Sequence, residues 1–84
     1  MTIESLKELI DARKIKWTAH CLEKMGERDI DIEDVKQAFS IGEIIEDYPD
    51  DFPHPSCLIY VKIDERVIHV VAGTDGQVVY IITA

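Results

Sequence analysis

The chain has 84 residues, of which 46% are hydrophobic, and its 17 acidic and 9 basic side chains give a net charge of −8. This length and apolar fraction predict one folded domain and exclude a disordered chain. No apolar run approaches the roughly 20 residues that span a bilayer, and the N-terminus lacks the pattern of a signal peptide. We therefore expect a soluble cytoplasmic protein in which two isolated cysteines, Cys21 and Cys57, stay reduced.

The acidic charge balance also restricts the partners of the protein. Binding to a nucleic-acid backbone gains most of its affinity from Lys and Arg, so proteins that do this usually have a basic face. This chain as a whole repels polyanions. Any contact with nucleic acid must therefore rely on a local basic patch, or on a partner that supplies the positive charge.

The first half of the chain has the pattern of helices. Apolar residues recur at helical spacing after Thr2, which predicts a helix over about residues 3–13. Thr18 is the expected N-cap of a second helix, and Asp31 that of a third helix, which ends near Gly42. The residues expected to face inward are Trp17, Cys21 and Met25 in the second helix, and Ile32, Val35, Ala38 and Phe39 in the third.

The second half changes to the spacing of strands, expected at residues 43–48, 56–63, 66–72 and 77–83. A loop with three prolines follows the first strand, and turns at Asp64-Glu65 and Asp75-Gly76 join the last three strands into an antiparallel meander. The predicted fold class is α+β, with two to three N-terminal helices packed on one face of a three- to four-stranded antiparallel sheet. Residues 1–84 are expected to form a single domain.

The alternation in these strands places several polar side chains on one face. If Asp64-Glu65 forms a two-residue turn, Tyr60 lies opposite His69, and either position of the next turn puts Tyr80 on the same face. A single β-bulge would break this alignment. His69 could then serve as a general acid–base group or, with the tyrosines, as a platform on which a base stacks. A histidine that only packs within a half-buried sheet is the commoner alternative. The opposite face is expected to receive the helices with Ile59, Val61, Ile68, Val70, Val79 and Ile81.

A second candidate site is the stripe His20, Lys24 and Arg28, in which each residue follows the last by four. An imidazole for proton transfer and two cations for charge stabilisation are what a phosphate-directed site requires. The alternative is a solvated helix face, in which Glu23 and Glu27 pair locally with the two cations.

Other motifs give little support for cofactors. His54 and Cys57 have the H-x-x-C spacing of a metal pair, but a second clear pair is missing, so we expect no metal site. The acidic run from Glu43 to Asp51 lacks the spacing of a calcium loop and is more typical of a solvated edge or a dock for a basic partner. There is no phosphate-binding glycine loop, nucleophile elbow or dinucleotide fingerprint. We expect no cofactor.

Two blocks of the sequence, H-C-L-E-K-M-G-E-R-D-I from His20 and G-E-I-I-E-D-Y-P-D-D from Gly42, resemble a prokaryotic family, domain of unknown function 4258. Its pattern is H-A-x-x-R-M-x-x-R-G-I, then G-E-I-I-E-x-Y, a Pro-rich loop and a strand ending in H-V-V. The similar part is residues 17–84, with residues 1–16 as an N-terminal helical addition. The chain departs from the pattern at Cys21, Lys24 and Asp29, where the family has Ala, Arg and Gly.

The resemblance implies a fold similar to RelE- and BrnT-like toxins, several of which cleave mRNA without metal and are held inactive by an antitoxin. It implies that His20 or His69 acts as the acid–base group, while Lys24 and Arg28 stabilise a phosphorane-like state.

The predicted substrate-binding residues are Tyr48, which the resemblance implies, and Tyr60 and Tyr80, which the strand alternation selects. The expected partners are an antitoxin protein, RNA and a second copy of the chain, with neither DNA nor a membrane. The sequence leaves one alternative function, a non-catalytic interaction module that uses the acidic edge over residues 43–51 to bind a basic protein.

Overall fold

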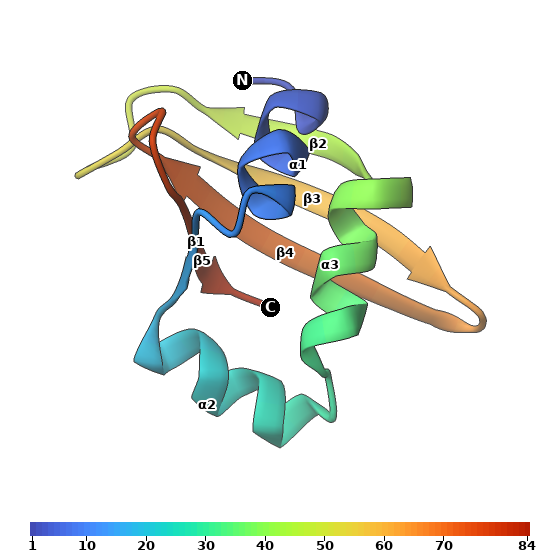
Figure 1. The fold of residues 1–84 in the computed structure, drawn as a ribbon. Coiled ribbons are helices and arrows are strands. Elements are labelled where there is room, and N and C mark those ends of the chain that lie inside the picture. The colour runs from blue at the N-terminus through green and yellow to red at the C-terminus, as the bar shows by residue number, and fades with distance from the viewer.

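The computed structural model describes residues 1–84 as three helices and one five-stranded sheet (Figure 1). The strand order is β1-β5-β4-β3-β2, and β1 runs parallel to β5 while the other neighbours are antiparallel. In Figure 1, α1 and α3 lie across the same face of the sheet, and α2 packs against β5. The predicted α+β class is therefore confirmed, but the sheet has one strand more than expected and is mixed instead of wholly antiparallel, because β1 is parallel to β5. The elements are α1 (Ile3–Asp11), β1 (Ile15–Trp17), α2 (Ala19–Arg28), α3 (Ile32–Ile41), β2 (Glu43–Tyr48), β3 (Ser56–Ile63), β4 (Arg66–Thr74) and β5 (Val79–Thr83).

The additional strand, β1, has only three residues and lies between the first two helices. Its pairing with β5 is extended by two hydrogen bonds, from the Val79 amide to the Lys14 carbonyl (2.9 Å) and from the Thr18 amide to the Ile81 carbonyl (3.3 Å). A strand this short carries too few residues to show an alternating pattern. Its pairing satisfies backbone groups that β5 would otherwise leave unpaired at the edge of the sheet.

The helices begin at the N-caps that the sequence predicts. The Thr2 and Thr18 hydroxyls accept hydrogen bonds from backbone amides three residues further on, at 3.1 and 3.0 Å. Asp31 and Asp34 form a capping box, in which each carboxylate accepts a hydrogen bond from the other residue's amide, at 2.8 and 3.1 Å. These bonds satisfy amides that have no partner within the helix. Helix α1 is shorter than expected because Arg13 already has a φ of 63°.

Gly42 ends α3, as predicted, for a reason that the sequence did not indicate. Its φ is −83°, so the left-handed conformation that usually favours glycine at this place is absent. Helix α3 instead meets the start of β2 and the neighbouring β3 so closely that a Cβ on Gly42 would lie 2.7 Å from the Tyr60 carbonyl oxygen. No larger residue fits this junction without a shift of backbone.

The core lies between the three helices and one face of the sheet. The predicted sheet residues are all buried there, and from the helices Leu6, Ile10, Cys21, Met25, Val35, Ala38 and Phe39 pack against them. The expectation for Ile32 was wrong, because this side chain is 45% exposed. Ile32 is the first residue of α3 and faces the groove toward α2 instead of the sheet. Trp17 is only partly buried, because it belongs to β1.

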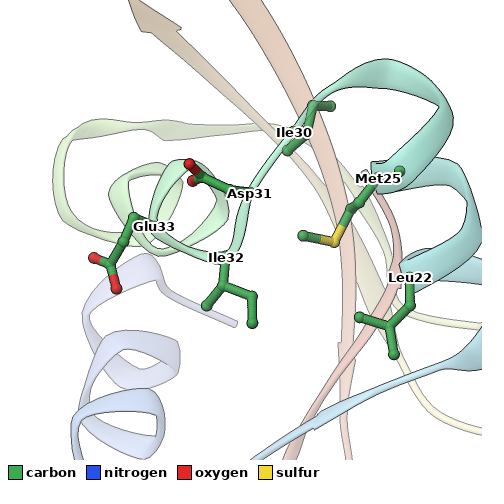
Figure 2. A pocket seen from close by; sticks show the side chains of 7 residues that line it. Leu22, Met25, Ile30, Asp31, Ile32 and Glu33 are labelled. Carbon is green, nitrogen blue, oxygen red and sulfur yellow. The ribbon is translucent and has the colours of Figure 1, made fainter.

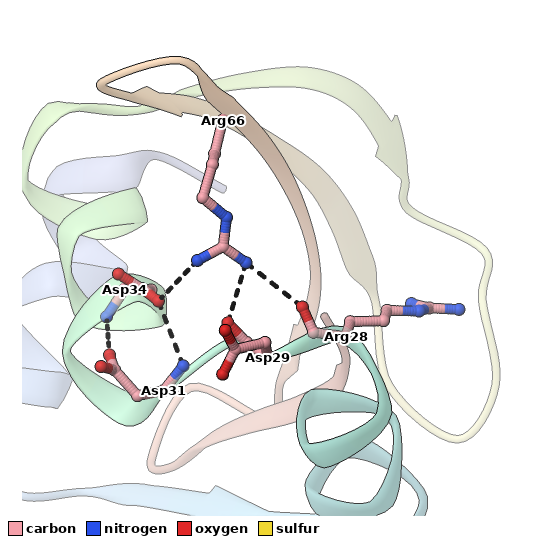
Figure 3. Close-up of polar contacts among 5 residues, drawn as sticks. All are labelled: Arg28, Asp29, Asp31, Asp34 and Arg66. Atoms are coloured by element: carbon pink, nitrogen blue, oxygen red, sulfur yellow. Dashed lines mark hydrogen bonds and ion pairs between the residues drawn. The ribbon is translucent and has the colours of Figure 1, made fainter.

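A single arginine connects the end of α2 to the start of α3 and to β4 (Figure 3). Asp29 ends α2 in the left-handed conformation, with a φ of 55°. From β4, Arg66 Nη2 donates hydrogen bonds to the carbonyls of Arg28 (3.2 Å) and Asp29 (2.9 Å), and Nη1 lies 3.7 Å from Asp34 Oδ2. This clamp fixes where α2, which carries the basic stripe, ends relative to the sheet.

Candidate functional site

The face of the sheet opposite the helices carries the histidine and tyrosines that the strand pattern selected. Tyr60 pairs with His69 across β3 and β4, which confirms the predicted register. Their ring centroids lie 5.8 Å apart with an interplanar angle of 65°, an edge-to-face contact. His69 is exposed and Tyr60 is partly buried, so a ligand can reach the imidazole directly.

Tyr80 lies on this same face but belongs to a different contact. Thr74 pairs with Val79, so the hairpin loop has four residues instead of the predicted two. Because the difference is an even number of residues, the side chains of β5 keep their predicted faces. The β-bulge in this pair begins at Val71 and Ala72, beyond the pairing of Gly73 with Tyr80. Tyr80 therefore keeps its predicted face.

The partner of Tyr80 is His54, which the sequence suggested only as a weak metal ligand. The two rings stack with centroids 5.3 Å apart and an interplanar angle of 10°. His54 comes from the loop between β2 and β3, and no sequence spacing predicts where such a loop folds. Cys57, three residues later, is buried on the helix side of the sheet, so the two do not form a metal pair. No group of three or more His, Cys, Asp or Glu side chains is placed to hold a metal ion.

The β2–β3 loop folds back over this face and closes a cavity of about 250 Å³ against β4 and β5. Three bonds hold the loop: Ser56 Oγ donates to Asp51 Oδ2 (2.6 Å), the Phe52 amide donates to Asp51 Oδ1 (3.1 Å), and the Thr74 amide donates to the Pro55 carbonyl (3.1 Å). The cavity is lined by Thr18, Asp51, Phe52, Pro53, His54, Gly73, Tyr80 and Ile82. Of the two histidine–tyrosine pairs on the face of the sheet opposite the helices, the cavity adjoins His54 and Tyr80.

The α2 stripe is engaged in part within the protein. Lys24 Nζ pairs with Glu27 Oε2 at 3.1 Å, and Arg28 Nη1 donates to the Ala84 carbonyl at 2.7 Å. His20 is exposed in the first turn of α2, two residues after Thr18, and has no hydrogen-bond or ion-pair partner. No hydrogen bond, ion pair or ring contact joins the stripe to His69. Joint action of the stripe and His69 stays a prediction.

Tyr48, the third predicted substrate-binding tyrosine, lies on the edge strand β2, where it pairs with Ser56. Its hydroxyl donates a hydrogen bond to the Glu46 carboxylate. This hydrogen bond, together with burial and the charges of Glu46 and Asp51, raises the pKa of Tyr48. Tyr48 therefore lies among carboxylates and stays protonated, whereas Tyr60 and Tyr80 each contact an imidazole.

The positive charge that the open face offers is local. The three ion pairs of the protein involve Lys7, Lys24 and Arg66. Lys16, which pairs with Tyr80 in register, and Lys62, which lies two residues from Tyr60 on β3, are exposed and have no carboxylate partner. These two lysines lie on the same face of the sheet as the histidine–tyrosine pairs.

A second hollow lies on the helical side, between α2 and α3 (Figure 2). Leu22 and Ile32 line it with 48% and 45% of their surfaces exposed, and Asp31 and Glu33 supply its charged side chains. This groove of about 480 Å³ contains no histidine and no cation. Its charged side chains are both carboxylates, so we place the candidate site on the open sheet face, which carries the histidines and two unpaired lysines.

The comparisons with known proteins identify the family. A family model described as "Domain of unknown function (DUF4258)" matches residues 17–84, which leaves out α1, begins at the last residue of β1 and includes all later elements. No match to a curated protein or to a solved structure was found. No helix of the chain has the length and apolar character needed to cross a membrane. With the family model covering most of its length, the chain belongs to the family DUF4258, a domain of unknown function.

Proposed function

We propose that the chain is a toxin-type domain that binds RNA on its open sheet face and cleaves it without metal. The observation that carries this proposal is the placement of two histidine–tyrosine pairs, His69 with Tyr60 and His54 with Tyr80, on one solvent-facing surface. Aromatic and imidazole rings on an uncovered sheet can stack against unpaired bases, which is how single-stranded RNA is commonly bound.

The chemistry needs only an acid and a base. A base removes the proton from a ribose 2′-hydroxyl, the oxygen attacks the adjacent phosphorus, and an acid protonates the departing 5′ oxygen. The phosphate becomes a 2′,3′-cyclic ester, and the leaving strand ends in a 5′-hydroxyl. Imidazole serves in either role near neutral pH. In this proposal His69 is the acid–base group on the sheet, and His20 is the other candidate.

The cations that this proposal requires differ in whether they already bind a partner within the protein. Lys16 and Lys62 are free to contact phosphates on the open face. To contact a phosphate, Lys24 must first break its ion pair with Glu27. This pair is exposed and contributes about 0–1 kcal/mol to stability. Arg28 must give up its hydrogen bond to the Ala84 carbonyl before it can stabilise a phosphorane-like state. Local cations of this kind are what an acidic chain requires for contact with a polyanion.

The test is cleavage of a single-stranded ribo-oligonucleotide by the purified protein in EDTA. We expect product ends that carry a 2′,3′-cyclic phosphate and no cleavage of the 2′-deoxy analogue. His69→Ala should reduce the rate by roughly 100-fold or more, the usual range for loss of an acid–base group. Leu22→Ala, on the exposed side of α2 away from this face, is the matched control and should cleave like the wild type.

Growth on induced expression gives an independent measurement. The wild type should arrest growth, and His69→Ala, His20→Ala and Arg28→Ala should relieve the arrest in proportion to their cleavage rates. A wild type that neither cleaves RNA nor arrests growth would overturn the proposal. The antitoxin partner and the homodimer are further elements of this proposal, to be tested by co-purification and by the mass of the protein in solution.

One observation favours a second function, the non-catalytic interaction module. Strand β2 is an edge of the sheet, and the segment from Glu43 to Asp51 carries five exposed carboxylates. A basic segment that pairs with this edge would gain backbone hydrogen bonds and opposite charge. This function predicts that a lysine-rich strand peptide perturbs the amides of β2, and that His69→Ala changes stability alone.

A further inference from the structure

We infer that the cavity under the β2–β3 loop is a nucleobase subsite that selects guanine. This inference rests on the proposed function, because it names the base that the open sheet face recognises. The cavity of about 250 Å³ lies beside the stacked His54 and Tyr80 rings and is closed on the other side by the loop. Its occupant must be flat, partly apolar and able to hydrogen bond.

The shape of the cavity favours a ring. Gly73 lies beside Tyr80 on β4, and a Cβ at this position would come 3.3 Å from the Pro55 carbonyl and 3.4 Å from Ile82 Cδ1. Glycine thus keeps open the space between the sheet and the loop. At the loop, Phe52 is 89% exposed and has no ring contact within the protein. An exposed phenyl ring beside a stacked imidazole and phenol provides faces on which a base can stack.

The polar group that selects the base is Asp51. Each of its oxygens already accepts one hydrogen bond, Oδ1 from the Phe52 amide and Oδ2 from Ser56 Oγ. A carboxylate oxygen has a second lone pair, so Asp51 can accept one more hydrogen bond at each oxygen. The two existing bonds hold the carboxylate in place before a ligand arrives.

Thr18 cannot compete for this role. Its hydroxyl lies 3.1 Å from both the Ile81 and the Ile82 carbonyls, to which it donates, and it accepts a hydrogen bond from the Cys21 amide. Its one donor is therefore used within the protein, and it offers a single remaining acceptor lone pair. Asp51 is the lining side chain that offers two adjacent acceptor oxygens.

Two adjacent acceptors match only one base. Guanine presents its N1–H and its N2 amino group side by side, and these can donate to the two carboxylate oxygens together. Adenine and cytosine present an amino group beside an acceptor nitrogen, which an ionised carboxylate repels, and uracil presents one N–H between two carbonyls. Paired charge-assisted hydrogen bonds are shorter and stronger than neutral ones, so the difference between the bases should be large.

The test is titration of isotopically labelled protein with the four free nucleosides, which carry no phosphate, followed by amide chemical shifts. We expect guanosine to shift the amides of Gly73, Tyr80 and the loop, and to bind at least tenfold more tightly than adenosine, cytidine or uridine. Equal binding of all four nucleosides, or guanosine shifts confined to other surfaces, would overturn the inference.

Two variants sharpen the test. Asp51→Asn keeps an acceptor for the Phe52 amide and a polar partner for Ser56, but it presents a donor beside an acceptor. This pattern matches adenine and cytosine, so the variant should bind guanosine at least tenfold more weakly and adenosine and cytidine more tightly. Phe52→Ala should weaken every nucleoside by roughly fivefold or more through loss of stacking. Leu22→Ala, in the α2–α3 groove, is the control and should bind like the wild type. If Asp51→Asn fails to fold, the ranking of the four nucleosides on the wild type decides the inference by itself.

Failure of this inference is distinguishable from failure of the proposed function. Cleavage of RNA in the absence of guanosine binding would overturn the guanine subsite and leave the ribonuclease proposal standing. Guanosine binding by a protein that cleaves no RNA would overturn the ribonuclease proposal and leave the guanine subsite standing.

Discussion

Replacing Arg66 with alanine removes the side chain that joins three elements, and its effect on stability can be worked out from the contacts. The guanidinium donates hydrogen bonds to the carbonyls of Arg28 and Asp29, which belong to the last turn of α2 and its cap. Terminal carbonyls of this kind have no partner within their own helix. The same side chain lies 3.7 Å from the Asp34 carboxylate at the start of α3.

The expected loss is the sum of these contacts. A hydrogen bond within a protein contributes about 0.5–1.5 kcal/mol, and the lower half of that range applies because water reaches the Arg66 side chain, which is 46% exposed. The partly exposed ion pair adds about 0–1 kcal/mol. Arg66→Ala should therefore lower the free energy of unfolding by about 1–3 kcal/mol. For a domain of this size, that corresponds to a fall in Tm of roughly 4–24 °C.

The assay is urea unfolding followed by circular dichroism and by the fluorescence of Trp17. Arg66→Lys is the matched control, since it keeps the charge near Asp34 but has no fork with which to reach two carbonyls at once. We expect it to lose about half as much stability as Arg66→Ala. Salt at 1 M should weaken only the ion pair. An Arg66→Ala variant as stable as the wild type, or a difference that salt removes completely, would refute the assignment of the carbonyl bonds.

Three further predictions concern the fold. Gly42→Ala should destabilise the protein by about 1–3 kcal/mol in urea unfolding, because the added Cβ would collide with backbone atoms. Gly26→Ala should stabilise it by about 0.5–1 kcal/mol, because the added Cβ has no atom within 4 Å and alanine favours the helix. Burial raises the pKa of Cys57 to about 11, so the thiol loses its proton at lower pH in the unfolded chain than in the folded one. The free energy of unfolding should therefore fall above about pH 9, by at most about 1.4 kcal/mol per pH unit. A Cys57→Ala variant whose stability falls equally steeply in this range would contradict the prediction. Hydrogen bonds from the Gln77 and Val78 amides lower the pKa of Asp75. The ionised carboxylate should therefore stabilise the folded protein at neutral pH, and this stabilisation should be lost as the pH falls through the lowered pKa. Equal stabilities of Asp75→Ala and the wild type at neutral pH would contradict this prediction.

The sequence predicted those parts of the fold that depend on local chemistry. The caps at Thr2, Thr18 and Asp31 follow from side chains that can bond nearby amides, and the pairing of Tyr60 with His69 follows from one tight turn. These features need no knowledge of distant parts of the chain. They account for the confirmed helices, the meander and the open sheet face.

What the sequence could not predict depends on distant contacts. β1 exists because residues 15–17 meet residues 79–81, and three residues carry no pattern. His54 reaches Tyr80 because a loop with three prolines folds back over the sheet, which no periodicity encodes. Arg66 looks like an ordinary strand residue until its side chain meets the end of α2. In the candidate site, the sequence found His69 and the tyrosines but missed His54 as their companion.

The claim that RNA binds the open sheet face is tested most directly by mapping a ribo-oligonucleotide that cannot be cleaved, with 2′-O-methyl groups, onto the labelled protein. This measurement separates binding from chemistry, because the nucleophile of the cleavage reaction is blocked. The account predicts amide shifts at Tyr60, His69 and Gly73, with few changes on the helical side. Shifts centred on Leu22 and Ile32 in the α2–α3 groove, or no shifts anywhere, would contradict it.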